Sequence, residues 1–327
     1  MAGFIGESTE VLAHYTGPRL GGLLNATLGN AAELIITVVA IREGLLELVK
    51  ASITGSILGN ILLVMGMSMV LGGQRNGIQR FDRQQASNNA ILLLLAVIAL
   101  LVPSMLSSAI GEEGSLRVEA LSLGVAVIMI ILYAAGLYYG YKAQNGPLAA
   151  PASVEMVVGE GQVSTNKAES HPKAWSLRTA LIVLSISTVG VAYLSELLVG
   201  AVEPVVTSLG VSEFFLGIIL IPIVGNVAEH LVAVKVAIQN KMDLSVEIAI
   251  ASSLQIALFV APFLVFISLL MGNPLTLIFN QFELLALIVG VLITALVSSD
   301  GESNWLEGAG LLAVYLILVL AFFLLPV

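Results

Sequence analysis

Nine long apolar stretches limit what this chain can fold into. A helix needs about 20 apolar residues to cross roughly 30 Å of hydrocarbon, and stretches of that length recur between charged or Gly/Pro-rich breaks. Membrane-spanning helices are therefore predicted at about 20–41, 45–71, 89–110, 118–141, 177–202, 214–238, 246–271, 279–298 and 305–326. Helices are expected because lipid offers no partner to the unpaired backbone of an open strand. The predicted fold class is all-α, in a polytopic membrane protein.

The composition supports this class and excludes several kinds of site. Only 11% of the residues are charged, whereas charged residues make up about a quarter of an ordinary soluble domain. With 13 Lys and Arg against 22 Asp and Glu, the chain lacks the basic excess that neutralises phosphates, so no nucleic-acid partner is expected. The sequence has no cysteine and three histidines, so the expected ligands of any metal are oxygen atoms. No cofactor is expected; the lipid bilayer is the expected environment.

The chain divides into two related parts. Residues 142–176 contain three prolines, several Gly and Ser, and no long apolar run, which predicts a linker. The motif Gly29-Asn30-x-Ala32-Glu33, before the linker, recurs after it as Gly225-Asn226-x-Ala228-Glu229. Residues 1–141 are therefore predicted to form a first repeat and residues 177–327 a second.

The two repeats are expected to be inverted, with five helices each. Five predicted crossings separate the motif copies, and an odd number gives the copies opposite orientations in the membrane. Residues 3–16 are too short and polar to cross a membrane, so they are predicted to be a half-helix, the end of a span that lacks its beginning. Glu10 in this fragment corresponds by position to Glu196, in the span that opens the second repeat.

The basic residues predict the orientation. Cytoplasmic loops of membrane proteins carry an excess of Lys and Arg. If the linker is cytoplasmic, ten basic residues lie on that side, and three, Arg42, Lys50 and Arg117, lie on the other. The linker is therefore predicted to face the cytoplasm, and the protein is expected in the cell membrane of a prokaryote. The sequence leaves homo-oligomerisation open.

Two glutamates near the middle of their spans are the strongest candidates for a functional site. Glu33 and Glu229 are flanked by apolar residues, and an ionised carboxyl that faces lipid costs several kcal/mol. One explanation is a pair of carboxyls that are merely hydrogen-bonded between helices. Matched positions in opposed repeats favour an interior cavity that binds an ion instead.

The Gly-Asn pair before each glutamate predicts a break in the helix. Gly is a poor helix former and Asn competes for backbone hydrogen bonds, so breaks are expected at Gly29-Asn30 and Gly225-Asn226. A break frees oxygen atoms beside the carboxylate, and hard cations such as calcium bind about six to eight oxygens. Small residues at helix interfaces also explain the glycines. The two breaks and the two glutamates together predict a calcium site.

Three polar residues of the following spans are expected around this site. A shift of 196 residues, which superposes the motifs, also places Ser56 on Ser252, and Gln255 lies one turn further along. We expect the three side chains to form hydrogen bonds around the cation. Hydrogen bonds that pack helices together are the alternative explanation for the serines.

Other ionisable residues are expected at gates or vestibules. His230 follows Glu229 and has Leu34 as its counterpart in the first repeat, which favours a structural or gating role over ligation. Carboxylates near helix ends are usually solvated. A gating or vestibule role is predicted for the following residues of this kind: Glu10, Glu196, Asp300 and Glu302.

Several segments together resemble a known family. Their sequences are GLLNATLGNAAELI, GSILGNILLV, GNVAEHLVAV, KMDLSVEIAIASSLQIALFVAP and SSDGESNWLEG, and they are similar to those of the calcium/proton exchanger (CAX) family of the cation/calcium exchanger superfamily. The resemblance implies eleven helices, a first helix followed by two inverted five-helix repeats, with an acidic cytoplasmic connection. It implies that Glu33 and Glu229 bind calcium and carry protons. The family's first helix and half of its second have no counterpart here.

The expected activity is the exchange of cytoplasmic calcium for protons. Two ionised carboxylates close together in a low-dielectric cavity repel each other, so an empty site retains protons, whereas a divalent cation neutralises both carboxylates and expels them. Inverted repeats around a midplane site favour alternating access over a passive cation channel.

The nearest alternative is a sodium/calcium exchanger, a family with Ser/Thr and Pro around the repeat glutamate, which this chain lacks. A hydrolase using a serine with His230 is disfavoured because no matched Asp is present, so no enzymatic activity is expected.

Overall fold

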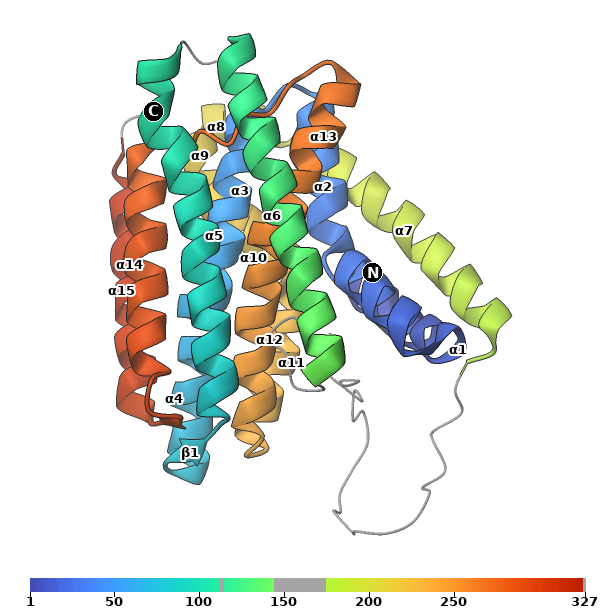
Figure 1. Ribbon diagram of the computed structural model, residues 1–327, viewed down its shortest axis with the longest axis vertical. Helices are drawn as coiled ribbons and strands as arrows, with labels where there is room; N and C mark the ends of the chain where they lie inside the picture. Colours follow the sequence, from blue (N-terminus) through green and yellow to red (C-terminus); the bar gives the residue numbers. More distant parts are fainter. Residues whose placement is uncertain (112–114, 144–174, 326–327) are drawn as a thin grey trace.

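The structure is a computed structural model that describes residues 1–111, 115–143 and 175–325, and nearly all of these are helical. Up to residue 143 the elements are α1 (Ala2–Leu28), α2 (Ala31–Arg42), α3 (Leu46–Leu58), the π-helix η1 (Gly59–Val64), α4 (Met65–Asn76), β1 (Gln79–Arg80), α5 (Arg83–Ile110) and α6 (Leu116–Ala143). From residue 175 they are α7 (Leu177–Gly200), α8 (Val202–Leu209), α9 (Glu213–Phe215), η2 (Leu216–Leu220), α10 (Ile221–Gly225), α11 (Val227–Ile238), α12 (Met242–Gln255), η3 (Ile256–Val260), α13 (Ala261–Met271), α14 (Gln281–Val297), β2 (Glu302–Ser303) and α15 (Trp305–Phe323). Figure 1 shows most helices side by side, with α1 and α7 inclined along one side of the bundle.

The predicted all-α class is confirmed, and the helices have the length and composition of membrane spans. Among the described residues, six helical segments are long and apolar enough to cross a membrane. The bent pair Glu213–Gly225 and Val227–Ile238 makes a seventh candidate, and α14 is apolar but shorter. The predicted span at 20–41 is divided between α1 and α2. The count of nine full spans stays a prediction.

The N-terminal half-helix predicted at 3–16 is wrong in its bounds. α1 runs without interruption from Ala2 to Leu28 and therefore joins this fragment to the first part of the predicted span 20–41. Pro18 lacks a backbone N–H, so one intrahelical hydrogen bond is lost at this residue, but the helix continues through it. The first break in the chain thus lies at Gly29-Asn30 and not before residue 20.

The segments around the two motif copies have closely matched lengths. α2 and α11 each contain 12 residues and begin directly after the asparagine of the motif. Each is followed by a helix, a π-helix and a further helix: α3, η1 and α4 after the first motif, and α12, η3 and α13 after the second. Single π turns inside helices often lie at functional sites. The shift of 196 residues that superposes the motifs also superposes the two π-helices. η1 begins one residue earlier than η3, and both end at equivalent residues.

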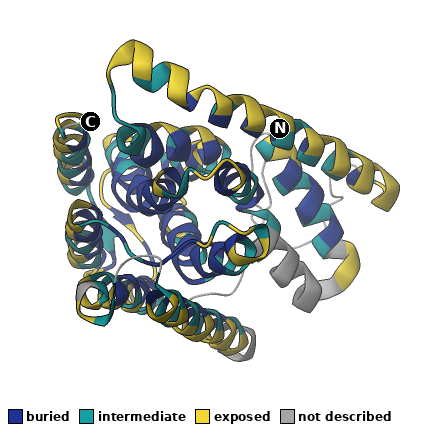
Figure 2. Cartoon of the chain, turned by 90° about the horizontal axis from the view of Figure 1, so that it is seen from above, coloured by how far each residue is buried: buried dark blue, intermediate teal, exposed yellow. Residues whose placement is uncertain are grey.

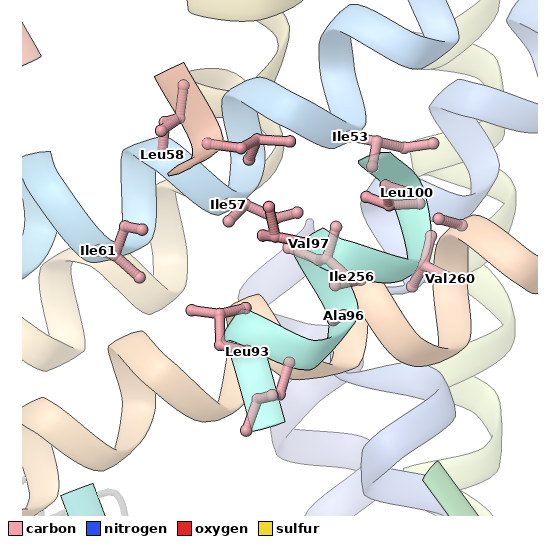
Figure 3. Packing of buried hydrophobic residues seen from close by; sticks show 14 of the residues in the cluster. Ile53, Ile57, Leu58, Ile61, Leu93, Ala96, Val97, Leu100, Ile256 and Val260 are labelled. Carbon is pink, nitrogen blue, oxygen red and sulfur yellow. The ribbon is translucent and has the colours of Figure 1, made fainter. Parts of the chain in front are cut away.

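The core surrounds α3, which lies at the centre of the bundle. Every residue from 48 to 58 is buried, and Figure 2 shows buried residues gathered on the inner helices while the outer helices expose their outward faces. In Figure 3, Ile57 of α3 lies beside Val97 of α5 and Ile256 of η3, and Ile53 lies beside Leu100 of α5. The π-helix η3 is thus part of the same buried cluster as α3 and α5.

A short strand pair ties the two halves of the chain together at one end. β1 and β2 are antiparallel, with Gln79 opposite Ser303 and Arg80 opposite Glu302. Arg80 Nε also donates to Glu302 Oε1 at 3.0 Å. The loop after α4 is thereby joined to the loop before α15, at the end where α4 and α15 pack together.

Candidate functional site

Both motif copies interrupt their helices, at the positions where the Gly-Asn pairs predict a break. α1 ends at Leu28 and α2 begins at Ala31, while α10 ends at Gly225 and α11 begins at Val227. The intervening asparagines have nearly the same backbone conformation, with φ −96° and ψ 27° at Asn30 and φ −99° and ψ 8° at Asn226. The second break bends the helix by 62°. Two short helices, α2 and α11, therefore start inside the bundle.

The two motif glutamates occupy the first turns of these inner helices. Glu33 lies three residues after Asn30 and is buried, and Glu229 lies three residues after Asn226 and is half-buried. Their carboxyl groups are near enough to interact electrostatically. Helix N-termini carry partial positive charge that favours nearby anions. The fold therefore brings two carboxyl groups from distant parts of the sequence to one place, each at the start of a helix.

The carboxyl of Glu33 lies against the opposite break. A Cβ atom added at Gly225 would be 3.3 Å from Oε1 of Glu33, so the absence of a side chain at residue 225 leaves room for this carboxyl. Oε1 of Glu33 and Oδ1 of Asn226 are both buried and have no hydrogen-bond donor within the described part of the chain. Buried oxygens without a donor are uncommon in folded proteins. These two oxygens are available to a proton or a cation.

Ser252 connects the two motifs through hydrogen bonds. Its hydroxyl donates to Oε2 of Glu229 at 2.7 Å and lies 3.5 Å from Oδ1 of Asn30. A hydroxyl has one hydrogen, so the shorter contact to Glu229 is the stronger one. The Asn30 amide in turn donates to Oε1 of Gln255 at 2.8 Å. Ser252 and Gln255, both on α12, thus contact residues of the two motifs. Their place around a cation stays a prediction.

Ser56, the counterpart of Ser252 in the first repeat, contacts the asparagine of the second motif. The Asn226 amide donates to Oγ of Ser56 at 3.2 Å and to the backbone carbonyl of Pro222 at 3.1 Å. Both side chains are buried. Each motif asparagine is therefore hydrogen-bonded to a helix that follows the other motif. Asn226 of the second motif bonds to α3, and Asn30 of the first motif bonds to α12.

Asn60 is a polar residue of the predicted span 45–71 that contacts the residues around the two motifs. Its amide donates to Oγ of Ser252 at 3.1 Å, and its Oδ1 lies 3.2 Å from Nε2 of His230. Asn60 therefore joins His230 to the serine that contacts Glu229. Its counterpart under the repeat shift is Ile256, so a search for matched polar positions does not find it. The available signal is a third Gly-Asn pair, Gly59-Asn60, inside an apolar span.

The other predicted gate and vestibule residues take part in separate contacts. Glu196 is exposed and forms an ion pair with Arg42, at 3.1 Å, where α2 ends. Asp300 accepts a hydrogen bond from the backbone N–H of Glu302, beside the strand pair. Glu10 is half-buried within α1. A gating role for these four carboxylates and for His230 stays a prediction.

The described residues contain no group of three or more His, Asp or Glu side chains arranged to hold a metal ion. A cation at the two breaks would therefore be bound by two carboxylates and by neutral oxygens, such as those of Asn226 and Asn30. Neutral oxygens, carbonyls and water complete the shell of a hard cation such as calcium.

Comparison with known proteins identifies the family. A family model described as "Sodium/calcium exchanger protein" matches residues 1–142 and 179–324. The chain belongs to this family. Among the sodium/calcium exchanger proteins it is similar to the "Ca(2+)/H(+) antiporter" of Aphanothece halophytica, with 48% identity over 331 residues that cover 100% of this chain and 88% of the relative. It is also similar to the "Ca(2+)/H(+) antiporter ChaA" of Bacillus subtilis (strain 168), with 44% identity over 99% of this chain and 89% of that protein.

A solved structure of a similar protein has the same fold. "Structure of native YfkE" matches with a TM-score of 0.81 and 42% identity, over 99% of this chain and 88% of that one. The resemblance to the calcium/proton exchangers is thereby confirmed.

Proposed function

We propose that this chain is a secondary active transporter that exchanges calcium for protons, by alternating access at a site formed by Glu33 and Glu229. The observation that carries the proposal is the meeting of the two motifs. The Glu33 carboxyl lies against Gly225, with Oε1 buried and without a donor among the described residues, and it interacts electrostatically with Glu229. The Ca(2+)/H(+) antiporters named above, similar over the full length of the chain, support the same activity.

Competition between calcium and protons at the same carboxyls explains obligatory exchange. Two carboxylates in a cavity of low dielectric constant are stable when they are protonated or when a divalent cation lies between them. Both of these states are close to neutral, whereas an empty site with two ionised carboxylates carries a charge of −2. A charged site is costly to enclose in the membrane. The transporter therefore changes between inward and outward states mainly when it is protonated or loaded with calcium.

The neighbouring polar residues have distinct roles in this mechanism. Ser252 donates to Oε2 of Glu229 and so directs the other carboxyl oxygen toward the cation. Asn30 and Asn226 contribute carbonyl or side-chain oxygens where the helices break, beside Gly29 and Gly225. Ser56 and Gln255 hold the two asparagines in place. His230, whose side chain contacts Asn60, acts in gating.

The proposed topology is two inverted repeats of five helices, at 1–141 and 177–327. The matched lengths of α2 and α11 and of the π-helical segments after them support this arrangement. The excess of basic residues supports a cytoplasmic linker at 142–176; most of the linker lies outside the described residues. In the cell membrane of a prokaryote, the proton gradient would then drive calcium out of the cytoplasm.

Transport by the purified protein in lipid vesicles tests this function. Vesicles loaded at acid pH and diluted into alkaline buffer with calcium should accumulate calcium, and an ionophore that collapses the pH gradient should stop the accumulation. A sodium gradient in place of the pH gradient should have little effect, because the Ser/Thr and Pro of the sodium/calcium exchangers are missing around both glutamates. Uptake that responds to sodium and ignores pH would instead identify a sodium/calcium exchanger. Movement insensitive to both gradients would identify a channel.

A further inference from the structure

A pocket lined in part by two basic residues lies beside α4 and α11. Its volume is about 440 Å³. The residues that line it are Arg75 on α4, Leu231, Val234, Lys235 and Ile238 on α11, and Gln239 directly after α11. The pocket is separate from the two-glutamate site, although α11 contributes to both.

The two basic residues of the pocket are not needed as donors to the free carbonyl groups at the end of α11. Arg75 and Lys235 lie in the last turns of α4 and α11, where cations commonly neutralise the helix dipole and the free carbonyls. The carbonyls at the end of α11 already have other donors. Asn76 donates to the carbonyls of Ala237 and Ile238, and Gln79 donates to that of Ala237.

Neither cation has an acidic partner nearby. Wherever the structure describes the chain, Arg75 and Lys235 form no ion pair. Two adjacent cations without counter-ions repel each other and attract an anion. The pocket therefore presents positive charge to whatever enters it.

Apart from Gln239, the remaining lining residues are apolar, and they belong to an apolar face along α11. Val227, Leu231, Val234 and Ile238 follow one another at spacings of four, three and four residues, which places them on one face of the helix. Leu231 is 67% exposed and Val227 is 46% exposed. Because α11 belongs to a candidate membrane span, this face contacts the acyl chains of lipids.

We propose that the pocket binds an anionic phospholipid, with its phosphate between Arg75 and Lys235 and its acyl chains along Val227 and Leu231. Basic pockets between helices at the cytoplasmic surface recognise anionic headgroups, and Arg is well suited to the phosphate oxygens. A soluble anion would satisfy the two cations but would leave the apolar face without a partner. A phospholipid satisfies both parts of the pocket at once.

Lipid binding at this place is expected to affect the transport site. Glu229 lies in the first turn of α11, and Lys235 lies in the last turn of the same 12-residue helix. A phosphate held between Arg75 and Lys235 would fix the end of α11 relative to α4, against which α11 packs. This second effect rests on the proposed function, whereas lipid binding itself does not.

Native mass spectrometry of the full chain in detergent tests the lipid site. The wild-type protein, titrated with phosphatidylglycerol and phosphatidylcholine at equal concentration, should retain phosphatidylglycerol with roughly tenfold preference, since two basic residues contribute. The double variant Arg75→Gln/Lys235→Gln should lose most of this preference. Arg178→Gln, which removes an exposed basic residue of α7, should keep it. The charge-conserving variant Arg75→Lys/Lys235→Arg should keep it as well, provided that it elutes as a single species.

Three results would overturn the proposal. The first is a wild-type protein without preference for phosphatidylglycerol. The second is an equal loss of preference in Arg178→Gln and in the double variant, which would indicate a general effect of surface charge. The third is displacement of the lipid by millimolar glycerol 3-phosphate, which would indicate a site for soluble phosphate. Calcium uptake in vesicles with and without phosphatidylglycerol then measures the effect on transport separately.

Discussion

The carboxyl of Glu33, on the helix that follows the first break, lies against Gly225, the last residue of the helix before the second break. A Cβ atom at residue 225 would be 3.3 Å from Oε1 of Glu33, with two further carbon atoms of the same side chain at 3.6 Å. The two copies of the motif therefore contact each other directly. This contact has consequences for substitutions at both residues.

The substitution Gly225→Ala should impair transport and leave folding intact. The new methyl group requires the Glu33 carboxyl to move by a few tenths of an ångström, and misplacement of a binding group lowers the affinity for the ion. We expect calcium uptake to fall by roughly threefold to tenfold, mainly through a higher KM. Gly59→Ala is the matched control, because a Cβ atom there contacts nothing within 4 Å. Equal uptake by the two variants would show that the Glu33 contact with Gly225 has no functional importance.

Removal of either carboxylate should abolish calcium transport. Glu33→Gln and Glu229→Gln each leave one negative charge to balance a divalent cation, and the remaining site cannot become neutral when calcium is bound. We expect uptake driven by a pH gradient to fall to the level of vesicles without protein. Glu203→Gln, which changes an exposed carboxylate of α8, should retain most of the activity. Near-normal uptake by either glutamine variant would contradict a site of two carboxylates.

The substitution Asn60→Leu should destabilise the protein around the site. It removes the amide that donates to Ser252 and the oxygen that contacts His230, so two buried polar groups lose a partner. Each unsatisfied group costs about 1–3 kcal/mol, which should lower the melting temperature of the purified protein in detergent. Asn60→Gln, which keeps both kinds of polar atom, should be less harmful. An unchanged melting temperature in Asn60→Leu would show that the Asn60 bridge does not stabilise the fold.

Close packing of α4 on α15 should make Gly308 intolerant of a side chain. A Cβ atom at Gly308 would lie 2.6 Å from the backbone nitrogen of Val70 and 2.7 Å from the carbonyl oxygen of Gly66, and backbone atoms cannot move aside as a flexible side chain can. Overpacking of this kind costs about 1–3 kcal/mol. Gly308→Ala should therefore lower the melting temperature. Gly310→Ala, on the same helix with open space around residue 310, should not lower it, and an equal effect of the two substitutions would argue against this packing.

The parts of the candidate site that were predictable from the sequence are those whose residue chemistry is informative and which occur in both repeats. A Gly-Asn pair weakens a helix wherever it occurs, and a buried glutamate needs a polar environment, so two copies of the motif indicated both breaks and both carboxyls. Asn60 lies at membrane depth but was not predicted as a site residue, because it has no polar counterpart in the second repeat. Its place in the site depends on contacts with His230 and Ser252. These contacts join residues that are far apart in the sequence, so the repeat pattern does not predict them.

The elements of the fold were predictable to different degrees. Long apolar stretches identified the helices because length and composition decide whether a segment can cross a membrane. The N-terminal helix was predicted incorrectly because residues 3–16 were judged as a separate short and polar segment, whereas α1 continues from Ala2 to Leu28. The ends of helices depend on a few backbone hydrogen bonds, which a single proline alters only locally.

The most direct test of the mechanism is a measurement of proton release when calcium binds. Calcium is added to the purified protein in weakly buffered detergent solution near neutral pH, and a pH indicator records the protons that appear. If calcium and protons compete for Glu33 and Glu229, the wild-type protein releases protons on calcium binding, and its apparent affinity for calcium falls as the pH is lowered. Glu33→Gln and Glu229→Gln should each lose this release. Calcium binding without proton release in the wild-type protein, or undiminished release in both variants, would contradict exchange at these two carboxylates.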